Sequence, residues 1–136
     1  MANIRISNEG RIGFVTMDRP PVNAMSTEMY GELNDAFRAV SQREDISVVL
    51  LVSSSERCFN AGADVKELSV LTGSGDSTRD EHRQALAHTM FDSILNNRQP
   101  VIGVINGPAL GAGAVIAACC DIRYASERAT IGMPEI

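Results

Sequence analysis

The sequence predicts an α/β fold built on a mainly parallel sheet. Two short apolar runs rich in β-branched residues, 47–52 and 101–105, have the composition of strands buried on both faces of such a sheet. Segments with helical periodicity precede the first run and separate it from the second. This alternation of strand, helix and strand indicates crossover connections, so ligands are expected at the loops that follow the strands' carboxyl ends.

The first elements of the chain are expected to form a hairpin and then a helix. Residues 4–8 and 11–17 favour strands, and a Glu-Gly turn signal lies between them. Pro20 and Pro21 cannot continue a strand because proline lacks an N–H donor. Ser26 stands at the position of a helix N-cap. The apolar stripe that follows has helical spacing and consists of Met29, Leu33, Phe37 and Val40.

Helices are also expected between the two buried strands. Asp64 is placed to cap a short helix over residues 65–71, and the composition of residues 72–78 is typical of a mobile loop. A second long helix is predicted over about 79–96, before Pro100.

Composition excludes several classes of protein. The 136 residues fit one domain, 1–136, and the net charge of −5 comes without a basic patch, which argues against a nucleic-acid partner. No apolar run reaches the ~18 residues of a membrane span. The N-terminus lacks the apolar region of a secretory signal, so a cytoplasmic or organelle-matrix location is expected.

No metal site is expected. Cys58, Cys119 and Cys120 form neither an even disulfide set nor a metal-binding spacing, and we interpret them as small buried thiols. His82 and His88 are six residues apart, which is not the spacing of a zinc-binding helix.

Two loops of small residues, 58–64 and 106–113, each follow a predicted buried strand and precede a predicted helix, the second at residues 114–119. The first N–H groups of a helix lack acceptors within it and lie at its positive end. Two such sets that meet at one oxygen would form an oxyanion hole. The alternative is that the small residues serve only close packing.

Three other glycine-loop chemistries do not fit the second loop. The third glycine of a dinucleotide-binding motif would fall at Ile116, and no Gly-Lys-Ser/Thr follows as in a Walker loop. No serine stands at the helix start as a nucleophile elbow requires.

With these loops in view, the chain resembles the crotonase (enoyl-CoA hydratase/isomerase) superfamily along its whole length. The resemblance rests on residues 61–68, 106–113 and 120–125, together with Arg-Pro at 19–20 and Asn-Ala-Met at 23–25. It implies a ClpP/crotonase-like spiral of β-β-α units. Family members are commonly about twice this length, so the domain is expected to be the N-terminal portion, lacking C-terminal helices that help to build trimers or dimers of trimers.

The resemblance also implies a site for an acyl-CoA thioester, with no separate cofactor because CoA is part of the substrate. The N–H groups of Ala63 and Ala112 would hold the thioester oxygen, with Ala112 replacing the usual glycine.

The CoA-binding residues that the resemblance implies are Arg57, Ala61, Gly62, Lys66 and Gly111. Ordinary solvated surface charge is the alternative for the two cations among them.

Hydratases of this superfamily typically use two glutamates, and the resemblance implies that this chain keeps one. The first position is Val115 and the second is Glu135. Moving a double bond needs one base, whereas adding water is easiest with two carboxylates. Isomerisation by Glu135 is therefore the favoured hypothesis. Hydration and non-catalytic acyl-CoA binding remain the alternatives.

Overall fold

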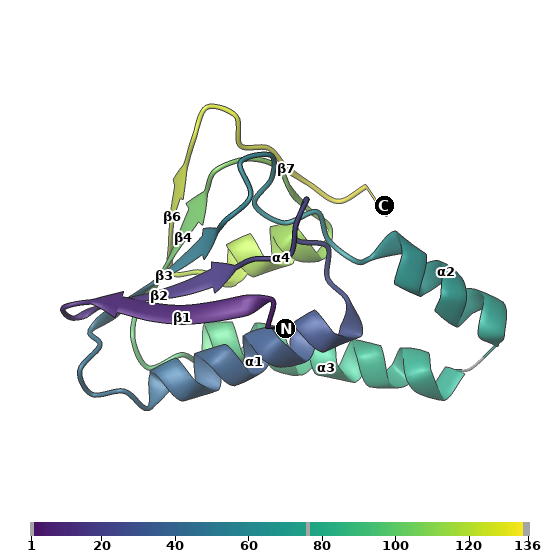
Figure 1. Ribbon diagram of the computed structural model, residues 1–136, viewed down its shortest axis with the longest axis horizontal. Helices are drawn as coiled ribbons and strands as arrows, with labels where there is room; N and C mark the ends of the chain where they lie inside the picture. The colour runs from purple at the N-terminus through teal and green to yellow at the C-terminus, as the bar shows by residue number, and fades with distance from the viewer. Residues whose placement is uncertain (1, 76, 135–136) are drawn as a thin grey trace.

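The computed structural model describes residues 2–75 and 77–134 of the chain (Figure 1). Strands and helices alternate along it as an α/β fold requires. They are β1 (Ile4–Glu9), β2 (Ile12–Met17), α1 (Thr27–Ser41), β3 (Val48–Ser53), α2 (Val65–Ser74), α3 (Ser77–Leu95), β4 (Val101–Ile105), β5 (Ala109–Leu110), α4 (Ala112–Cys119), β6 (Ile122–Ala125) and β7 (Ile131–Gly132).

The main sheet has the order β1-β2-β3-β4-β6. The expected hairpin is confirmed, since β1 and β2 pair antiparallel. The pairings of β2 with β3, β3 with β4 and β4 with β6 are all parallel, which confirms the mainly parallel sheet. The short strands β5 and β7 form a second sheet. The last two strand pairs, β4 with β5 and β6 with β7, each add one strand to each sheet, as in a β-β-α spiral.

The core lies between one face of the main sheet and helices α1 and α3, which run side by side below it in Figure 1. Alternate residues of β3 and β4 are fully buried on that face and only half-buried on the other. The expectation that both runs are buried on both faces was therefore wrong. Alternation arises because successive side chains of a strand point to opposite faces, and within the described residues only one face is fully covered.

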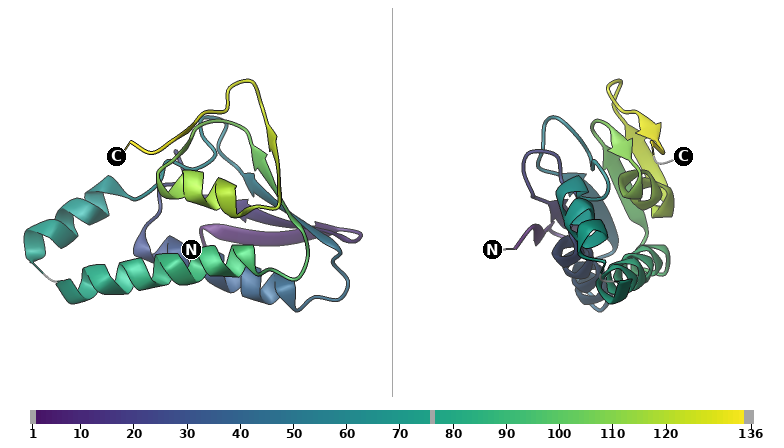
Figure 2. Two further views of the ribbon diagram at one scale, coloured as in Figure 1. Left: turned by 180° about the vertical axis from the view of Figure 1, so that it is seen from behind. Right: turned by 90° about the vertical axis from the view of Figure 1, so that its right-hand side faces the viewer.

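The predicted mobile loop at residues 72–78 was also wrong. Helix α2 continues to Ser74, Gly75 ends it with φ +67°, and α3 begins at Ser77. Asp76 lies outside the described residues. The glycine is the αL residue that commonly terminates a helix, so the described small polar residues here belong to the adjoining ends of two helices. The resulting α2–α3 hairpin projects beyond the sheet (Figures 1 and 2).

Both predicted N-caps are confirmed. Ser26 Oγ accepts a hydrogen bond from the Met29 N–H at 3.2 Å. The Asp64 side chain accepts from the N–H groups of Lys66 and Glu67. Each cap satisfies N–H groups that have no acceptor within their own helix.

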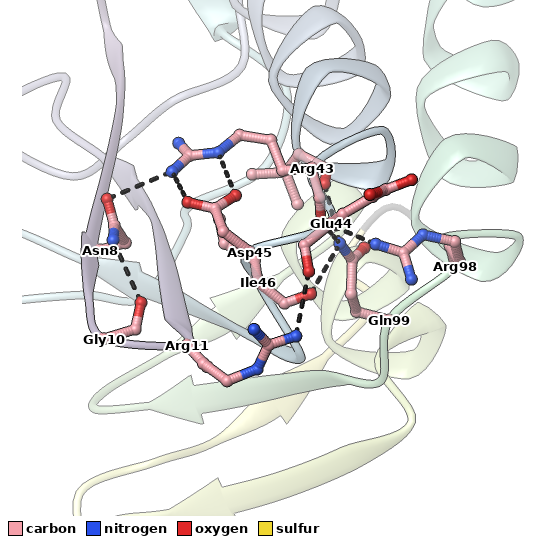
Figure 3. Close-up of polar contacts among 10 residues, drawn as sticks. Asn8, Gly10, Arg11, Arg43, Glu44, Asp45, Ile46, Arg98 and Gln99 are labelled. Atoms are coloured by element: carbon pink, nitrogen blue, oxygen red, sulfur yellow. Dashed lines mark hydrogen bonds and ion pairs between the residues drawn. The ribbon is translucent and has the colours of Figure 1, made fainter.

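The carboxyl end of α1 is satisfied by side chains from the segment before β4 (Figure 3). The buried Gln99 Nε2 lies within 3.3 Å of the carbonyl oxygens of Val40, Arg43 and Ile46. Arg98 Nη2 donates to the Arg43 carbonyl at 2.7 Å. These donors replace the N–H groups that a continuing helix would supply, and they fix α1 against the sheet.

The three cysteines are free and buried, as expected. Burial, aided by the neighbouring Cys119, raises the pKa of Cys120 to about 12, so this thiol stays protonated at neutral pH. In the described part of the chain, no helix combines the length and apolar character that crossing a membrane requires.

Candidate functional site

The two glycine-containing loops pack directly against each other. Asn60 forms a parallel bridge with Ala109, in which the Asn60 N–H donates to the Pro108 carbonyl at 3.2 Å and its carbonyl accepts from the Leu110 N–H at 3.0 Å. A Cβ at Gly113 would lie 2.3 Å from the Asn60 carbonyl oxygen. Only a residue without a side chain allows this approach.

Gly62 makes the second close contact between the loops. Its φ is +88°, and a Cβ there would lie 2.5 Å from the Leu110 carbonyl oxygen and 3.4 Å from the Ala112 amide nitrogen. The buried Asn60 side chain fixes this turn, because its Oδ1 accepts from the Gly62 N–H at 2.8 Å. The residue before Ala63 is thereby held beside the start of α4.

Neighbouring hydrogen bonds fix the direction of the Ala63 N–H. Met25 donates to the Gly62 carbonyl at 2.7 Å and accepts from the Asp64 N–H at 3.1 Å. In this parallel bridge Met25 uses the groups of residues 62 and 64. The N–H of Ala63 therefore points to the opposite side.

The Ala112 N–H is the first of helix α4. Gly111 is the N-cap residue, with φ +55° and no side-chain cap, and its own N–H donates to the Gly132 carbonyl at 2.9 Å. Within the described residues, neither the Ala63 N–H nor the Ala112 N–H has a protein acceptor. The positive end of α4 adds to the attraction of an anion at Ala112.

Both alanines line one cavity of about 380 Å³, called here the helix cavity. The loops and α4 supply Ala63, Gly111, Ala112 and Val115. Helix α3 supplies a wall on another side, and Tyr30 of α1 and Leu68 of α2 complete much of the lining. The structure thus brings together the two amides that the sequence singled out.

A second cavity of about 460 Å³, called here the loop cavity, adjoins the first through Ala63, which lines both. Its other lining residues include Arg19, Ala61, Asp64 and Lys66. Lys66 is exposed there on the first turn of α2. An elongated ligand could therefore occupy both cavities, with its middle at Ala63.

An ion pair joins two of the residues that line the loop cavity. Arg19 Nη2 lies 2.9 Å from Asp64 Oδ2, and Arg19 Nη1 donates to the Ala24 carbonyl at 2.7 Å. Burial by itself would raise the pKa of the Asp64 carboxyl. The hydrogen bond from Arg19, with those from the N–H groups of Glu67 and Lys66, outweighs burial, so the pKa is lowered.

The other predicted site residues fall in different places. Gly62 is buried between the loops, and Gly111 lines the helix cavity. Arg57 is exposed and lines neither cavity. Glu135 lies outside the described residues. Among the described residues, no group of three or more His, Cys, Asp or Glu side chains is arranged to hold a metal ion.

Sequence reasoning missed the α3 wall of the helix cavity. Gln84, His88 and Phe91 follow one another at spacings of four and three residues, so they share one helix face. The helical spacing was visible in the sequence, but two of the three side chains are polar, and polar residues on a helix usually face solvent rather than line a cavity. Arg19 was also missed, although its place in the Arg-Pro motif was a signal.

Comparison with known proteins identifies the family to which the chain belongs. The family model described as enoyl-CoA hydratase/isomerase matches residues 7–136. A probable mitochondrial enoyl-CoA hydratase of Dictyostelium discoideum is 36% identical over 129 residues, which cover 94% of this chain and 44% of that protein. A crotonyl-CoA hydratase of Syntrophomonas wolfei is 32% identical over 137 residues, covering 98% and 50%.

Solved structures show the same fold. A crystal structure of an enoyl-CoA hydratase/carnithine racemase from Magnetospirillum magneticum has a TM-score of 0.91 and 32% identity, covering 98% of this chain and 50% of that one. An enoyl-CoA hydratase from Bacillus anthracis has a TM-score of 0.90 and 29% identity, covering 98% and 51%. These matches confirm the crotonase-like fold. The chain spans about half the length of these relatives.

Proposed function

Because the chain belongs to the enoyl-CoA hydratase/isomerase family of the crotonase superfamily, we propose that it takes part in the chemistry of an acyl-CoA thioester whose enolate is held by two backbone amides. The supporting observation is that Ala63 and Ala112 line one cavity and that their N–H groups have no protein acceptor among the described residues. The function of the whole protein is part of this proposal, since the relatives extend well beyond the matched region.

The thioester oxygen is the group that such a pair of donors fits. When a proton leaves the acyl chain or a nucleophile adds to it, negative charge develops on that oxygen. Preorganised N–H groups stabilise the charge without having to reorient, and each such donor typically contributes ~3 kcal/mol to the transition state. The positive end of α4 acts in the same direction at Ala112.

The CoA moiety would lie in the loop cavity and the acyl group in the helix cavity. Ala63 lines both, so the thioester would lie where they meet. Ala61 and Gly62 would let the ligand approach the backbone closely, and Gly111 would position the Ala112 donor. The exposed Lys66 ammonium on the loop-cavity wall is available for a phosphate. Arg57 would contribute only as a cation near the outer end of the ligand.

Double-bond isomerisation is the reaction that the lining favours first. Val115 presents an apolar, half-buried side chain to the helix cavity, where a two-glutamate hydratase would have a carboxylate. In the proposed step the Glu135 carboxylate takes a proton from the carbon next to the thioester. The electron pair moves into a dienolate, and the same proton returns two carbons further along. One base completes this cycle.

Hydration is the second candidate, because the relatives reported above carry the name of hydratases. In that reaction water adds across the double bond, and the product gains the mass of one water. The protein should be incubated with 2-enoyl-CoA and 3-enoyl-CoA thioesters and the products read by mass and by diene absorbance. Binding without turnover would leave a non-catalytic acyl-CoA binder. Absence of any thioester binding would contradict the proposed function.

A further inference from the structure

The α3 wall of the helix cavity carries chemistry that the two-amide proposal does not use. Gln84, His88 and Phe91 line the cavity from one face of α3, with Arg83 and Ala87 beside them. The same cavity contains the two amides and the apolar Val115. A polar side chain on this wall therefore faces the space that the acyl group would occupy.

Among the described lining residues, His88 is the one that carries an imidazole, a side chain that commonly serves as a general acid or base in enzymes. The guanidinium of Arg83 is engaged by its own helix, because its Nε and Nη2 both donate to Asp80 Oδ1, at 3.3 and 3.0 Å. Tyr30 is buried, with 2% of the residue exposed.

Apart from the buried Tyr30, the other elements that line the cavity offer no described side chain that could act as an acid or base in place of His88. Leu68 of α2, Val115 of α4 and Met133 beyond β7 face the cavity with apolar side chains. The charge of Arg83 is balanced by the Asp80 carboxylate on the same helix. No described carboxylate lines the cavity.

We propose that His88 supplies, from α3, the second acid–base group that hydration needs and that Val115 cannot provide. The inference rests on the proposed function and favours its second candidate reaction. Glu135 would accept a proton from water while the water oxygen bonds to the β-carbon and the C=C electron pair moves to the thioester oxygen. The His88 imidazolium would then give its proton to the α-carbon, and the carbonyl would reform.

The proton balance closes with the addition of one water. After product release, protonated Glu135 returns its proton and neutral His88 regains one through solvent. No oxidant, metal or further reactant enters the cycle.

The chain offers a matched control, because its other histidine lies elsewhere. His82 lines a separate cavity with Thr27, Glu67, Leu71, Thr78 and Arg79. Both histidines are exposed residues of the same helix, so His88→Gln and His82→Gln carry similar folding risk and differ in the cavity that they face.

The first experiment measures hydration of a 2-enoyl-CoA. We expect His88→Gln to lower kcat by about 100-fold or more, with KM changed less than about threefold, and His82→Gln to retain wild-type kinetics. Imidazole added to His88→Ala should recover part of the lost kcat, which a merely structural role would not allow. The inference would be overturned if the kcat of His88→Gln for hydration were within about threefold of the wild-type value. It would also be overturned if the wild type catalysed only isomerisation and His88→Gln did not change that rate.

A second measurement does not depend on turnover. With only two histidines in the sequence, the imidazole proton resonances can be assigned by comparing His88→Gln and His82→Gln. A saturated acyl-CoA should shift the His88 resonance and leave that of His82 in place. Thioester binding without a His88 shift would overturn this inference alone, whereas no binding of any thioester would remove the proposed function and the inference together.

Discussion

Gly62 and Leu110 are in such close backbone contact that a Cβ on the glycine would lie 2.5 Å from the leucine carbonyl oxygen. This contact joins the loop after β3 to the loop after β4. It holds the Ala63 and Ala112 amides at the border of one cavity. The spacing of the two donors therefore depends on a residue with no side chain.

Gly62→Ala should be strongly destabilising. The new Cβ would collide with backbone that cannot move aside, and φ +88° is itself unfavourable for alanine. Gly75→Ala is the control, because Gly75 has φ +67° with no atom within 4 Å of the built Cβ. Urea unfolding should show a cost for Gly62→Ala that exceeds the control by ~1–3 kcal/mol. Equal costs would mean that the contact is unimportant.

Asp64 should make the free energy of unfolding depend on pH. Its folded-state pKa is lowered. Its contribution to the free energy of unfolding is therefore present at pH values above the ordinary aspartate pKa of about 4 and is lost as pH falls through the folded pKa. Asp64→Asn retains a capping side chain but cannot titrate. The difference in unfolding free energy between wild type and Asp64→Asn should be constant from pH 5 to 7 and shrink below about pH 4.

Asp64→Ala removes the cap as well as the ion pair. It should cost ~1 kcal/mol more than Asp64→Asn at neutral pH, measured by the same unfolding series. If the difference in unfolding free energy between wild type and Asp64→Asn grew as the solution is acidified, the assigned role of the carboxylate would be contradicted.

Lys66→Met should weaken binding of CoA itself, because it removes the ammonium from the wall of the loop cavity. Arg38→Met is the charge-matched control, since Arg38 is exposed on the last turn of α1 and lines neither cavity. Calorimetric titration should give a several-fold rise in Kd for Lys66→Met, corresponding to roughly 1 kcal/mol. The rise should diminish at high salt. An equal loss of CoA affinity in Arg38→Met would indicate that the overall charge of the protein, and not a contact with Lys66, accounts for the effect.

Glu135→Gln should abolish turnover and leave thioester binding intact. The amide keeps the size of the side chain but cannot accept and return a proton. Activity is measured by product mass and binding by calorimetry on the same preparation. Turnover within about tenfold of wild type would remove Glu135 from either proposed reaction.

The sequence predicted the parts of this fold that depend on local patterns. Ser26 and Asp64 were recognisable as caps from their positions before apolar or helical runs, and the parallel sheet followed from the strand–helix–strand order. Residues 72–78 were misassigned because glycine and serine suit a helix terminus as well as a long loop. The deciding feature, the αL conformation of Gly75, is a backbone property.

The candidate site was predictable only in part, for a related reason. Ala63 and Ala112 could be found because small residues at two strand–helix junctions form a recognisable pattern. The α3 wall could not, since His88 and Gln84 have the composition of a solvent-facing helix surface. Their role depends on how α3 packs beside α4 and the loops, which is tertiary information.

The direct test of the account is the carbonyl stretch of a bound acyl-CoA labelled with carbon-13 at the thioester, followed by difference infrared spectroscopy. Ala112→Pro deletes one donor at the first position of α4, where proline is well tolerated, and Ala112→Gly keeps it. We predict a shift to lower frequency in wild type and Ala112→Gly, and a clearly smaller shift in Ala112→Pro. An unshifted carbonyl in the wild type, or equal shifts in all three proteins, would contradict the two-amide oxyanion hole.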